Sequence, residues 1–560
     1  MSTGTAGTDV GTEIGTETST ETSTDIARTE TALPGAATRR YLAALRERGP
    51  LEIDWSAAPT RHKRYPGAPR LPLPWPPAAA PTNSGSGTAA VVGTLLGDLL
   101  GDLLGDLLGL ARTIWYHATD DEGRPEGVQP LLLLGRPAPS GGALYPVEVY
   151  LAAGDGSELP AALFHYDPVH HALERIRDGD HRPGLAESRV GVPDAVLALT
   201  AVFGRSAFKY GDLAYRLACQ ETGVLLAQAL AVGERLGLSA EVRLRYDDER
   251  VDRLLGLDGE REATLAVVAL RFADLGADSP SARQPGPPPS GPVWRANAPG
   301  PRPLPPGGAA AALHRAARVR GGSPQAVRVL QSSESPARGA ESVPLPPAPA
   351  IRLADGVPHR ASPPAGYRPG SLALPRLAAV IDAATQSYSG DLPGAEGGPA
   401  ATALHLLALH VEGLPTGAYR YEREQKVLVR ITDGSAVEAA IAAARLLPNT
   451  RAALRTAAAA VIPVGDPLAG VAGFGDRWYR MQQIEAGLAV HRAALAAAAS
   501  GLAARIHSDG AGEALDTLLG FAGSPQISLS FLLLGIPRLG GPTLARRFPR
   551  RAEGGSPAPP

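Results

Sequence analysis

The sequence predicts a protein of mixed helices and strands, built as two unequal copies of one domain. The segment KYGDLAYRLACQETGVLLAQALAVGERLGL at 209–238 aligns without a gap onto 473–502. In each half, short apolar runs with the alternation of strands surround this long helical pattern. A single repeat of this length indicates a duplicated domain. Its simplest form is a covalently fused dimer with a pseudo-two-fold interface.

Length and composition narrow the class of protein. The 560 residues suffice for two ordinary domains with extra segments, and the net charge of −2 does not suggest a nucleic-acid or membrane-surface protein. The one cysteine, Cys219, excludes an internal disulfide and a cysteine-based metal site, and it fits a reducing cytoplasm. We expect no secretory signal. The longest apolar run, 486–506, contains charged residues and predicts a buried helix, so no membrane span is expected.

Composition also divides the chain into five parts. They are a Thr/Ser/Glu-rich tail predicted to be disordered (1–35), a first domain (36–275), a Pro/Gly-rich linker (276–355), a second domain (356–541) and a C-terminal tail (542–560). The linker is expected to be largely disordered, with some helix potential at 307–320.

The first domain shows its elements in order. They are an amphipathic pattern (41–51), an extended Pro-rich segment (66–77), a leucine repeat predicted to be a buried helix (94–110), a strand (143–152), a hairpin (163–176), a long helix (213–238) and a buried strand (265–272).

Positions that differ between the copies are candidates for chemistry, because positions that both copies share are explained by a common scaffold. Lys209-Tyr210 becomes Gly473-Phe474 in the second copy, and Pro-Ser-Gly-Gly at 139–142 becomes Pro-Ala-Ala-Thr at 399–402. Conversely, only the second copy opens with Arg-x-Ser, at 360–362.

These residue types suit a polar, phosphorylated ligand. Glycines at 141 and 142 let backbone N–H groups and the Ser140 hydroxyl approach a flat polar ring closely, although an ordinary turn before a strand has the same sequence. Arg360 can offer a bidentate fork to phosphate, and Ser362 a further donor.

Together, RPAPSGGALYPVEVYL, HYDPVHHALE and the segment 209–238 resemble the SagB-type dehydrogenases of the nitroreductase superfamily. These are FMN-dependent azoline oxidases of thiazole/oxazole-modified peptide biosynthesis. The resemblance covers 125–275 well and 356–541 more faintly, and 54–74 is similar to the family's lead-in. It implies an α+β fold of two tandem nitroreductase-like domains. Each would have a mixed, mainly antiparallel sheet flanked by helices, and the two would pack as an intramolecular pseudo-dimer.

The resemblance also implies one FMN per chain, between the copies, because each copy has kept the half-site that the other has lost. The expected cofactor residues are Arg360 and Ser362 on the phosphate, Pro139, Ser140, Gly141 and Gly142 along the flavin, and Arg546 and Arg547 as further phosphate ligands. A solvated basic tail is the alternative for the last two.

The family's catalytic Lys-Tyr pair falls on Lys209 and Tyr210. A desolvated lysine can act as a neutral base, which an arginine cannot do, and Tyr210 would orient it or relay the proton. The alternative is a surface lysine beside a half-buried core tyrosine. We predict no metal site, because the hairpin histidines, His165, His170 and His171, have no cysteine or carboxylate cluster at ligand spacing.

The predicted function is oxidation of thiazoline or oxazoline rings in a ribosomally synthesised peptide, such as a thiopeptide. The expected partners are an azoline-containing precursor peptide and a cyclodehydratase, and a further homodimer stays open. One alternative is an NAD(P)H-dependent nitroreductase-like flavin reductase. The other is a flavin-less scaffold of a peptide-modifying complex.

Overall fold

The computed structural model describes most of both predicted domains. The described residues are 33–49, 53, 55, 58–74, 99–116, 131–155, 159–186, 191–272, 296, 302–319, 341–363, 366–392, 401–443, 448–508, 512–538 and 543–547. The predicted N-terminal tail therefore lies almost wholly outside the described residues.

The first half forms an antiparallel sheet in the order β1-β6-β5-β4-β7-β9-β8. Its strands are β1 (Arg70–Pro72), β4 (Val147–Ala153), β5 (Ala162–Asp167), β6 (Ala172–Asp178), β7 (Ala195–Val202), β8 (Leu238–Arg243) and β9 (Glu262–Phe272). Its helices include α4 (Arg182–Leu185), α5 (Gly204–Tyr210), α6 (Leu213–Arg235) and α7 (Asp248–Leu255). The predicted strands, hairpin and long helix of this half are confirmed.

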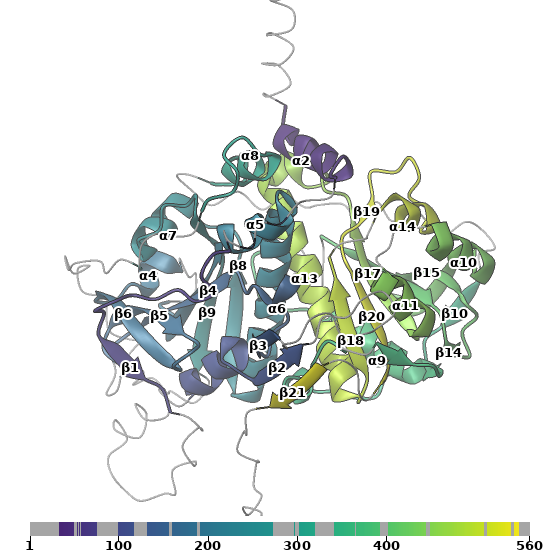
Figure 1. The fold of residues 1–560 in the computed structure, drawn as a ribbon, viewed down its shortest axis with the longest axis horizontal. Coiled ribbons are helices and arrows are strands. Elements are labelled where there is room, and N and C mark those ends of the chain that lie inside the picture. Colours follow the sequence, from purple (N-terminus) through teal and green to yellow (C-terminus); the bar gives the residue numbers. More distant parts are fainter. Residues whose placement is uncertain are drawn as a thin grey trace, which may run out of the picture.

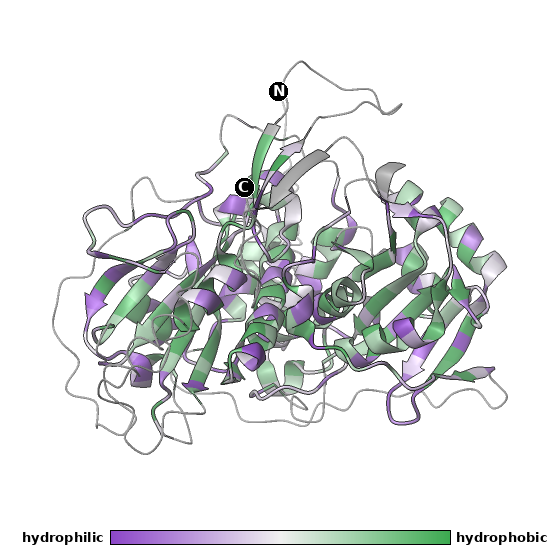
Figure 2. Ribbon diagram, turned by 90° about the horizontal axis from the view of Figure 1, so that it is seen from below, coloured by the Kyte–Doolittle hydropathy of each residue, from purple (hydrophilic) through white to green (hydrophobic). Residues whose placement is uncertain are grey.

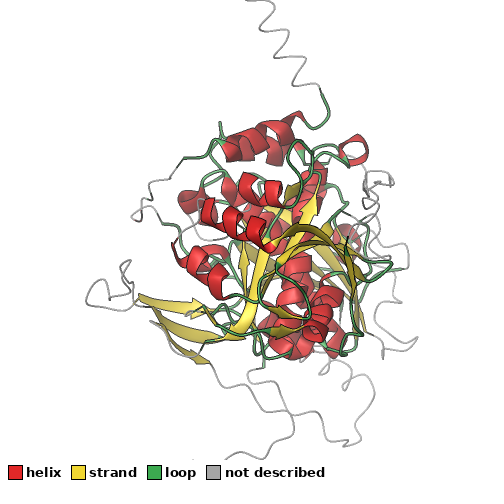
Figure 3. Cartoon of the chain, turned by 90° about the vertical axis from the view of Figure 1, so that its right-hand side faces the viewer, coloured by secondary structure: helices red, strands yellow, loops and turns green. Residues whose placement is uncertain are grey.

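The second half repeats this sheet in the order β10-β16-β15-β13-β17-β20, with β18 also paired to β20. The strands are β10 (Ser342–Pro344), β11 (Tyr367–Arg368), β13 (Ala403–Ala408), β15 (Gly417–Glu422), β16 (Val427–Asp433), β17 (Ala459–Gly465), β18 (Ala503–His507), β19 (Ile527–Ser528) and β20 (Phe531–Pro537). Its helices are α9 (Leu374–Ala384), α10 (Gly434–Ala443), α11 (Pro448–Thr456), α12 (Val471–Phe474), α13 (Arg477–Ala499) and α14 (Glu513–Leu518). Figure 3 views the molecule from the side of the second half, and in this view helices lie in front of the strands.

The long helices α6 and α13 lie together at the centre of the molecule, between the two sheets (Figure 1). A Cβ added at Gly223 would collide with the carbonyl oxygen of Ile484, and one added at Gly487 would collide with that of Gln220. Both pairs of equivalent residues are separated by the offset of the sequence repeat, so the two close contacts are reciprocal. Glycine at both positions lets the two backbones touch.

Two short helices are exchanged in the same reciprocal way. The N-terminus of α2 (Ala36–Arg46) donates to the Asp476 carboxylate at the start of α13, from Thr38 N at 2.8 Å. The N-terminus of α8 (Ala309–Ala316) donates to the Asp212 carboxylate at the start of α6, from Ala310 N at 3.1 Å. Each helix therefore satisfies the exposed backbone donors of its first turn with a carboxylate.

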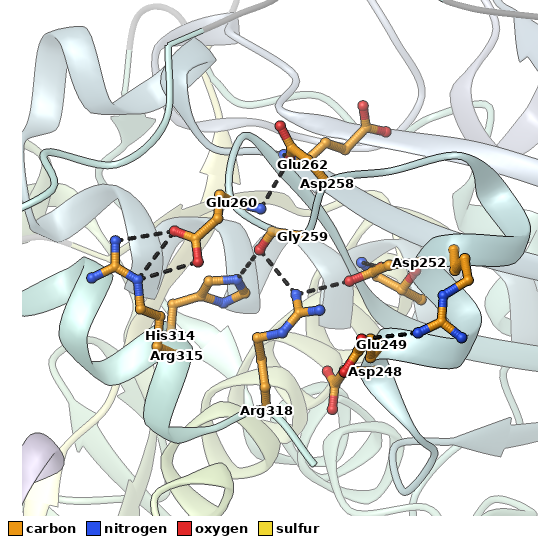
Figure 4. Close-up of polar contacts among 12 residues, drawn as sticks. Asp248, Glu249, Asp252, Asp258, Gly259, Glu260, Glu262, His314, Arg315 and Arg318 are labelled. Carbon is orange, nitrogen blue, oxygen red and sulfur yellow. Dashed lines mark hydrogen bonds and ion pairs between the residues drawn. The ribbon is translucent and has the colours of Figure 1, made fainter. Parts of the chain in front are cut away.

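The α8 segment is fastened to the first half by a polar cluster (Figure 4). His314 Nε2 lies 2.8 Å from the Gly259 carbonyl oxygen, and Arg318 donates to the same oxygen and to Asp252 at 2.8 Å. The helix potential predicted at 307–320 is confirmed by α8. The prediction of a largely disordered linker did not include β10, which is a strand of the second sheet.

A small separate sheet, in the order β21-β2-β3, pairs a strand near the C-terminus with two strands of the first half. It consists of β2 (Arg112–Tyr116), β3 (Leu131–Gly135) and β21 (Thr543–Arg547). The predicted C-terminal tail thus begins with a strand that pairs with the first half. A second small sheet pairs β12 (Leu372–Ala373) with β14 (Val411–Glu412) in parallel.

Apolar residues gather along the central helices and inner strands (Figure 2). The predicted leucine-repeat helix is confirmed at 99–108, where Leu100, Leu103, Leu104 and Leu107 are fully buried. No described helix has the length and apolarity needed to cross a membrane. The described residues also include no group of three or more His, Cys, Asp or Glu side chains placed to hold a metal ion.

Candidate active site

The Pro-Ser-Gly-Gly loop that enters β4 has an unusual backbone. It forms one turn of 3-10 helix, Gly141–Ala143, in which Gly142 has a φ of 63°. Ala143 and Tyr145 also have positive φ values, 54° and 48°. Non-glycine residues rarely adopt this left-handed region of backbone φ. Two of them here indicate a strained loop that its surroundings must hold in place.

Glu221, on α6, holds this loop. Its Oε1 accepts a hydrogen bond of 2.8 Å from Gly141 N, and the Ser140 hydroxyl also bonds to the carboxyl group. Ser140 Oγ in turn accepts from Tyr145 N at 2.8 Å. Burial raises the pKa of Glu221 to about 7, although the Gly141 and Ser140 hydrogen bonds oppose this rise. The Ser140 hydroxyl is therefore engaged within its own loop.

Lys209 and Tyr210 end α5 and lie directly beside the same loop. A Cβ added at Gly142 would lie 2.7 Å from Tyr210 Oη and 3.1 Å from Lys209 Nζ. Sequence positions nearly 70 residues apart are thus brought into contact, and only glycine at 142 leaves room for both side-chain ends.

The Lys209 amine is half-buried among aromatic rings. Its Nζ lies 5.3 Å from the centre of the Tyr210 ring and 5.4 Å from that of Trp55, which packs edge-on against Phe208. Burial lowers the pKa of Lys209, and the positive charge of Arg61 lowers it further. Both causes favour the neutral amine that a general base requires.

Arg360 brings the second half into contact with the segment just before this loop. It is 3% exposed, and its Nε donates to the Pro137 carbonyl oxygen at 2.9 Å. It also faces α13, since burial and the charge of Arg360 hold the pKa of His491 well below its usual value. Ser362 lies two residues further along this segment and is exposed.

The predicted residues Arg546 and Arg547 are connected to Arg360 through the backbone pairing of their strand with β2. Both lie in β21, where Arg546 pairs with Thr113 and Arg547 with Arg112. The Arg112 side chain donates to the Arg360 carbonyl oxygen at 3.2 Å. The loop thus contacts the Lys-Tyr pair at Gly142, and Arg360 lies beside Pro137, just before the loop, with β21 linked to it through Arg112.

Two residues beside the Pro-Ser-Gly-Gly loop, Glu221 and Arg136, were not predicted from the sequence. Glu221 is kept in both copies as Glu221 and Glu485, so comparing the copies assigned it to the scaffold. Arg136, just before the loop, is 1% exposed, and its Nη1 has no hydrogen-bond partner among the described residues. Its guanidinium lies 4.6 Å from the centre of the Tyr145 ring.

Comparisons with known proteins identify the fold. The chain superposes on a crystal structure of a putative nitroreductase from Anabaena variabilis with a TM-score of 0.71 and 23% identity, covering 90% of this chain and 99% of that one. The fold is that of a nitroreductase. Residues 112–270, which include the loop, the Lys-Tyr pair and Glu221, match the model of the nitroreductase family.

Two curated relatives match parts of the chain. The microcin B17-processing protein McbC of Escherichia coli is 33% identical over 153 residues, which are 26% of this chain and 56% of that protein. The putative nitroreductase MJ1384 of Methanocaldococcus jannaschii is 30% identical over 117 residues, which are 20% of this chain and 59% of that protein. The chain thus matches less than two thirds of the length of each relative.

Proposed function

We propose that the chain is an FMN-dependent dehydrogenase that oxidises thiazoline or oxazoline rings of a ribosomally made peptide to thiazoles or oxazoles. The observation that carries this proposal is the contact of Gly142 with the ends of Lys209 and Tyr210. A half-buried lysine beside an exposed glycine turn suits removal of a ring proton at a flat cofactor. The likeness to a microcin B17-processing protein supports a peptide substrate.

The residues present fit a flavin phosphate ester. The turn at 141–142 exposes backbone without side chains, and Arg136 offers a buried N–H group that has no partner among the described residues. Arg360 adds a cation from the second half. We propose that Pro139, Ser140, Gly141 and Gly142 hold the ring, and that Arg360, Ser362, Arg546 and Arg547 hold the phosphate. Because the Ser140 hydroxyl is engaged by Tyr145 and Glu221, its backbone is the part that would meet the ring.

Lys209 is the proposed base. Conversion of an azoline to an azole removes two hydrogens, one of which leaves as a proton to Lys209 Nζ. When bound, FMN supplies the acceptor for the other hydrogen and its electron pair. The lowered pKa increases the neutral fraction of Lys209, and Tyr210 Oη, which lies beside it at Gly142, positions the amine.

We further propose that the two halves form an intramolecular pseudo-dimer with one FMN site. The reciprocal contacts of Gly223 and Gly487, and the exchanged helices α2 and α8, support a pseudo-two-fold relation. The mirror-image position has Gly473 and Phe474 in place of the Lys-Tyr pair, and Phe474 is stacked on Trp478 in its own half. An azoline-containing precursor peptide and a cyclodehydratase are the proposed partners, in the cytoplasm.

The test is to purify the full chain and measure bound FMN together with loss of two hydrogens from an azoline peptide. We expect a yellow protein that carries out this oxidation. Rapid bleaching by NAD(P)H without azoline oxidation would instead favour a nitroreductase-like reductase, as would the likeness to MJ1384. A colourless protein with no FMN in the denatured supernatant would favour a scaffold.

The assignment of the base has its own test. Lys209→Ala should keep FMN bound but abolish turnover, because no neutral amine remains at the ring. The matched control is Lys426→Ala, which removes an exposed lysine paired with Asp382 in the second half and should change neither property. Normal azoline oxidation by Lys209→Ala would show that the base is another group.

A further inference from the structure

The two copies hold equivalent loops with equivalent glutamates. Glu221 on α6 accepts from Gly141 N at 2.8 Å, and Glu485 on α13 accepts from Ala401 N at 2.7 Å. Both carboxyl groups are buried, at 9% and 0% exposure. The same contact, in which a buried glutamate of the long helix accepts a hydrogen bond from a loop N–H group, is therefore present twice in one chain. We call this contact the glutamate clamp.

What lies beyond each clamp differs. The first loop continues to Gly142, in contact with Lys209 and Tyr210. The second continues to Thr402, where Gly473 and Phe474 replace the pair. The further partner of each carboxyl group also differs, since the Ser140 hydroxyl bonds to Glu221 and the Tyr388 hydroxyl to Glu485.

The backbones differ too. Ala143 and Tyr145, just beyond the first clamp, have left-handed φ values. In the second copy the positions equivalent to 141–145 are 401–405, of which 403–405 belong to β13, and none of them has a positive φ. Left-handed residues thus follow Gly141 in the first copy, whereas a strand follows Ala401 and Thr402 in the second. A strained segment keeps its conformation only where its surroundings impose it. Glu221 is the buried side chain that bonds to both Ser140 and Gly141, at the start of this strained segment.

We propose that Glu221 is a positioning residue, which sets the 140–145 loop against Lys209 and Tyr210, whereas Glu485 stabilises the second half alone. Glu221 does not contact the reacting atoms; it acts through the backbone of Gly141 and Gly142. The effect on turnover rests on the proposed function, but the effect on the loop does not.

The experiment compares Glu221→Ala with Glu485→Ala, because each removes a buried acceptor from a loop N–H. Hydrogen exchange at the amides of 140–145 reads the loop without any flavin. We expect these amides to lose protection in Glu221→Ala only, while thermal midpoints fall in both variants. In the loaded enzyme, Glu221→Ala should shift the visible flavin band and lower kcat at least about tenfold, since small misplacements of reacting groups have large effects. Glu485→Ala should leave the band and kcat unchanged.

Rescue distinguishes positioning from general damage. Glu221→Gln keeps the acceptor for Gly141 N and should restore the band and most of kcat. Should Glu221→Ala fail to fold, Ser140→Ala removes the Ser140–Glu221 bond together with the acceptor for Tyr145 N. The readout is then the exchange of the Gly141 amide, which bonds to Glu221 and should still lose protection. Unchanged loop exchange in the variants of residue 221 and of Ser140 would overturn the proposal, as would an equal loss of kcat in both glutamate variants. If the wild type lacks FMN, the proposed function fails while the exchange comparison still decides the role of Glu221.

Discussion

Gly142→Ala tests the contact between the loop and the Lys-Tyr pair. The new Cβ would lie 2.7 Å from Tyr210 Oη and 3.1 Å from Lys209 Nζ, so both groups must move. These are the ends of flexible side chains, so the displacement itself adds little to the loss of stability. The φ of 63° disfavours alanine by about 1–2 kcal/mol.

Gly501→Ala is the matched control. Gly501 has a φ of 70°, and a Cβ there would meet nothing within 4 Å. Both variants should therefore lose about 1–2 kcal/mol of unfolding free energy. Only Gly142→Ala should lose activity, by about 10–100-fold in kcat/KM, which corresponds to about 1.4–2.7 kcal/mol of transition-state stabilisation.

The assay is azoline oxidation under steady-state conditions, alongside urea unfolding of both variants. Equal kcat/KM values for Gly142→Ala and Gly501→Ala would refute the contact between the loop and the pair. A larger loss of stability in Gly142→Ala would also argue against it, because that would mean that the clash falls on rigid groups.

Three further predictions follow from the same contacts. Arg360→Ala should release FMN, measured by equilibrium dialysis, whereas Arg352→Ala, which removes an exposed arginine of the same segment, should retain it. Arg61→Gln removes a charge that lowers the pKa of Lys209, so the pH at which activity rises should move upward in the pH–rate profile. Asp248→Asn should destabilise the protein by about 3–5 kcal/mol in urea unfolding, because Asp248 bonds the buried Arg480 at 2.6 Å and also bonds Arg477.

The stabilisation that Asp248 provides depends on pH. Burial would raise its pKa, but Arg480 and Arg477 outweigh burial and hold the pKa at about 2, below its ordinary 3.8. The stabilisation is therefore full above pH 3.8 and is lost as the pH falls through 2. Asp248→Asn should lack this acid-dependent loss; a wild type equally stable at pH 4 and pH 2 would contradict the assignment. Full FMN retention by Arg360→Ala would contradict the assignment of Arg360 to the phosphate. An unchanged pH–rate profile in Arg61→Gln would contradict the effect of the Arg61 charge on Lys209.

Much of the architecture could be predicted from the repeat. The offset that aligns 209–238 with 473–502 also relates the reciprocal glycine contacts of α6 and α13, because duplication copies packing together with sequence. The structure brings Gly142 beside Lys209 and Tyr210, and the roles of these residues stay predictions. The repeat did not show β21, since it is stabilised by pairing with β2 and its own composition carries little signal. The sequence indicated helix potential at 307–320, where α8 lies, but not the contact of α8 with the first half.

Comparing the copies selects residues that differ, and for this reason it overlooked Glu221. A positioning residue inherited by both halves is invisible to that comparison. The buried Arg136 was not predicted for another reason. The chain is rich in arginine, and the sequence around each arginine does not indicate whether its guanidinium is buried or whether one of its N–H groups lacks a partner among the described residues.

The central claim is one flavin site per chain, built by both halves. The most direct measurement is titration of the flavin-free chain with FMN, followed by fluorescence quenching, to count the saturable sites. We expect one site per chain. Two equivalent sites, or none, would contradict it.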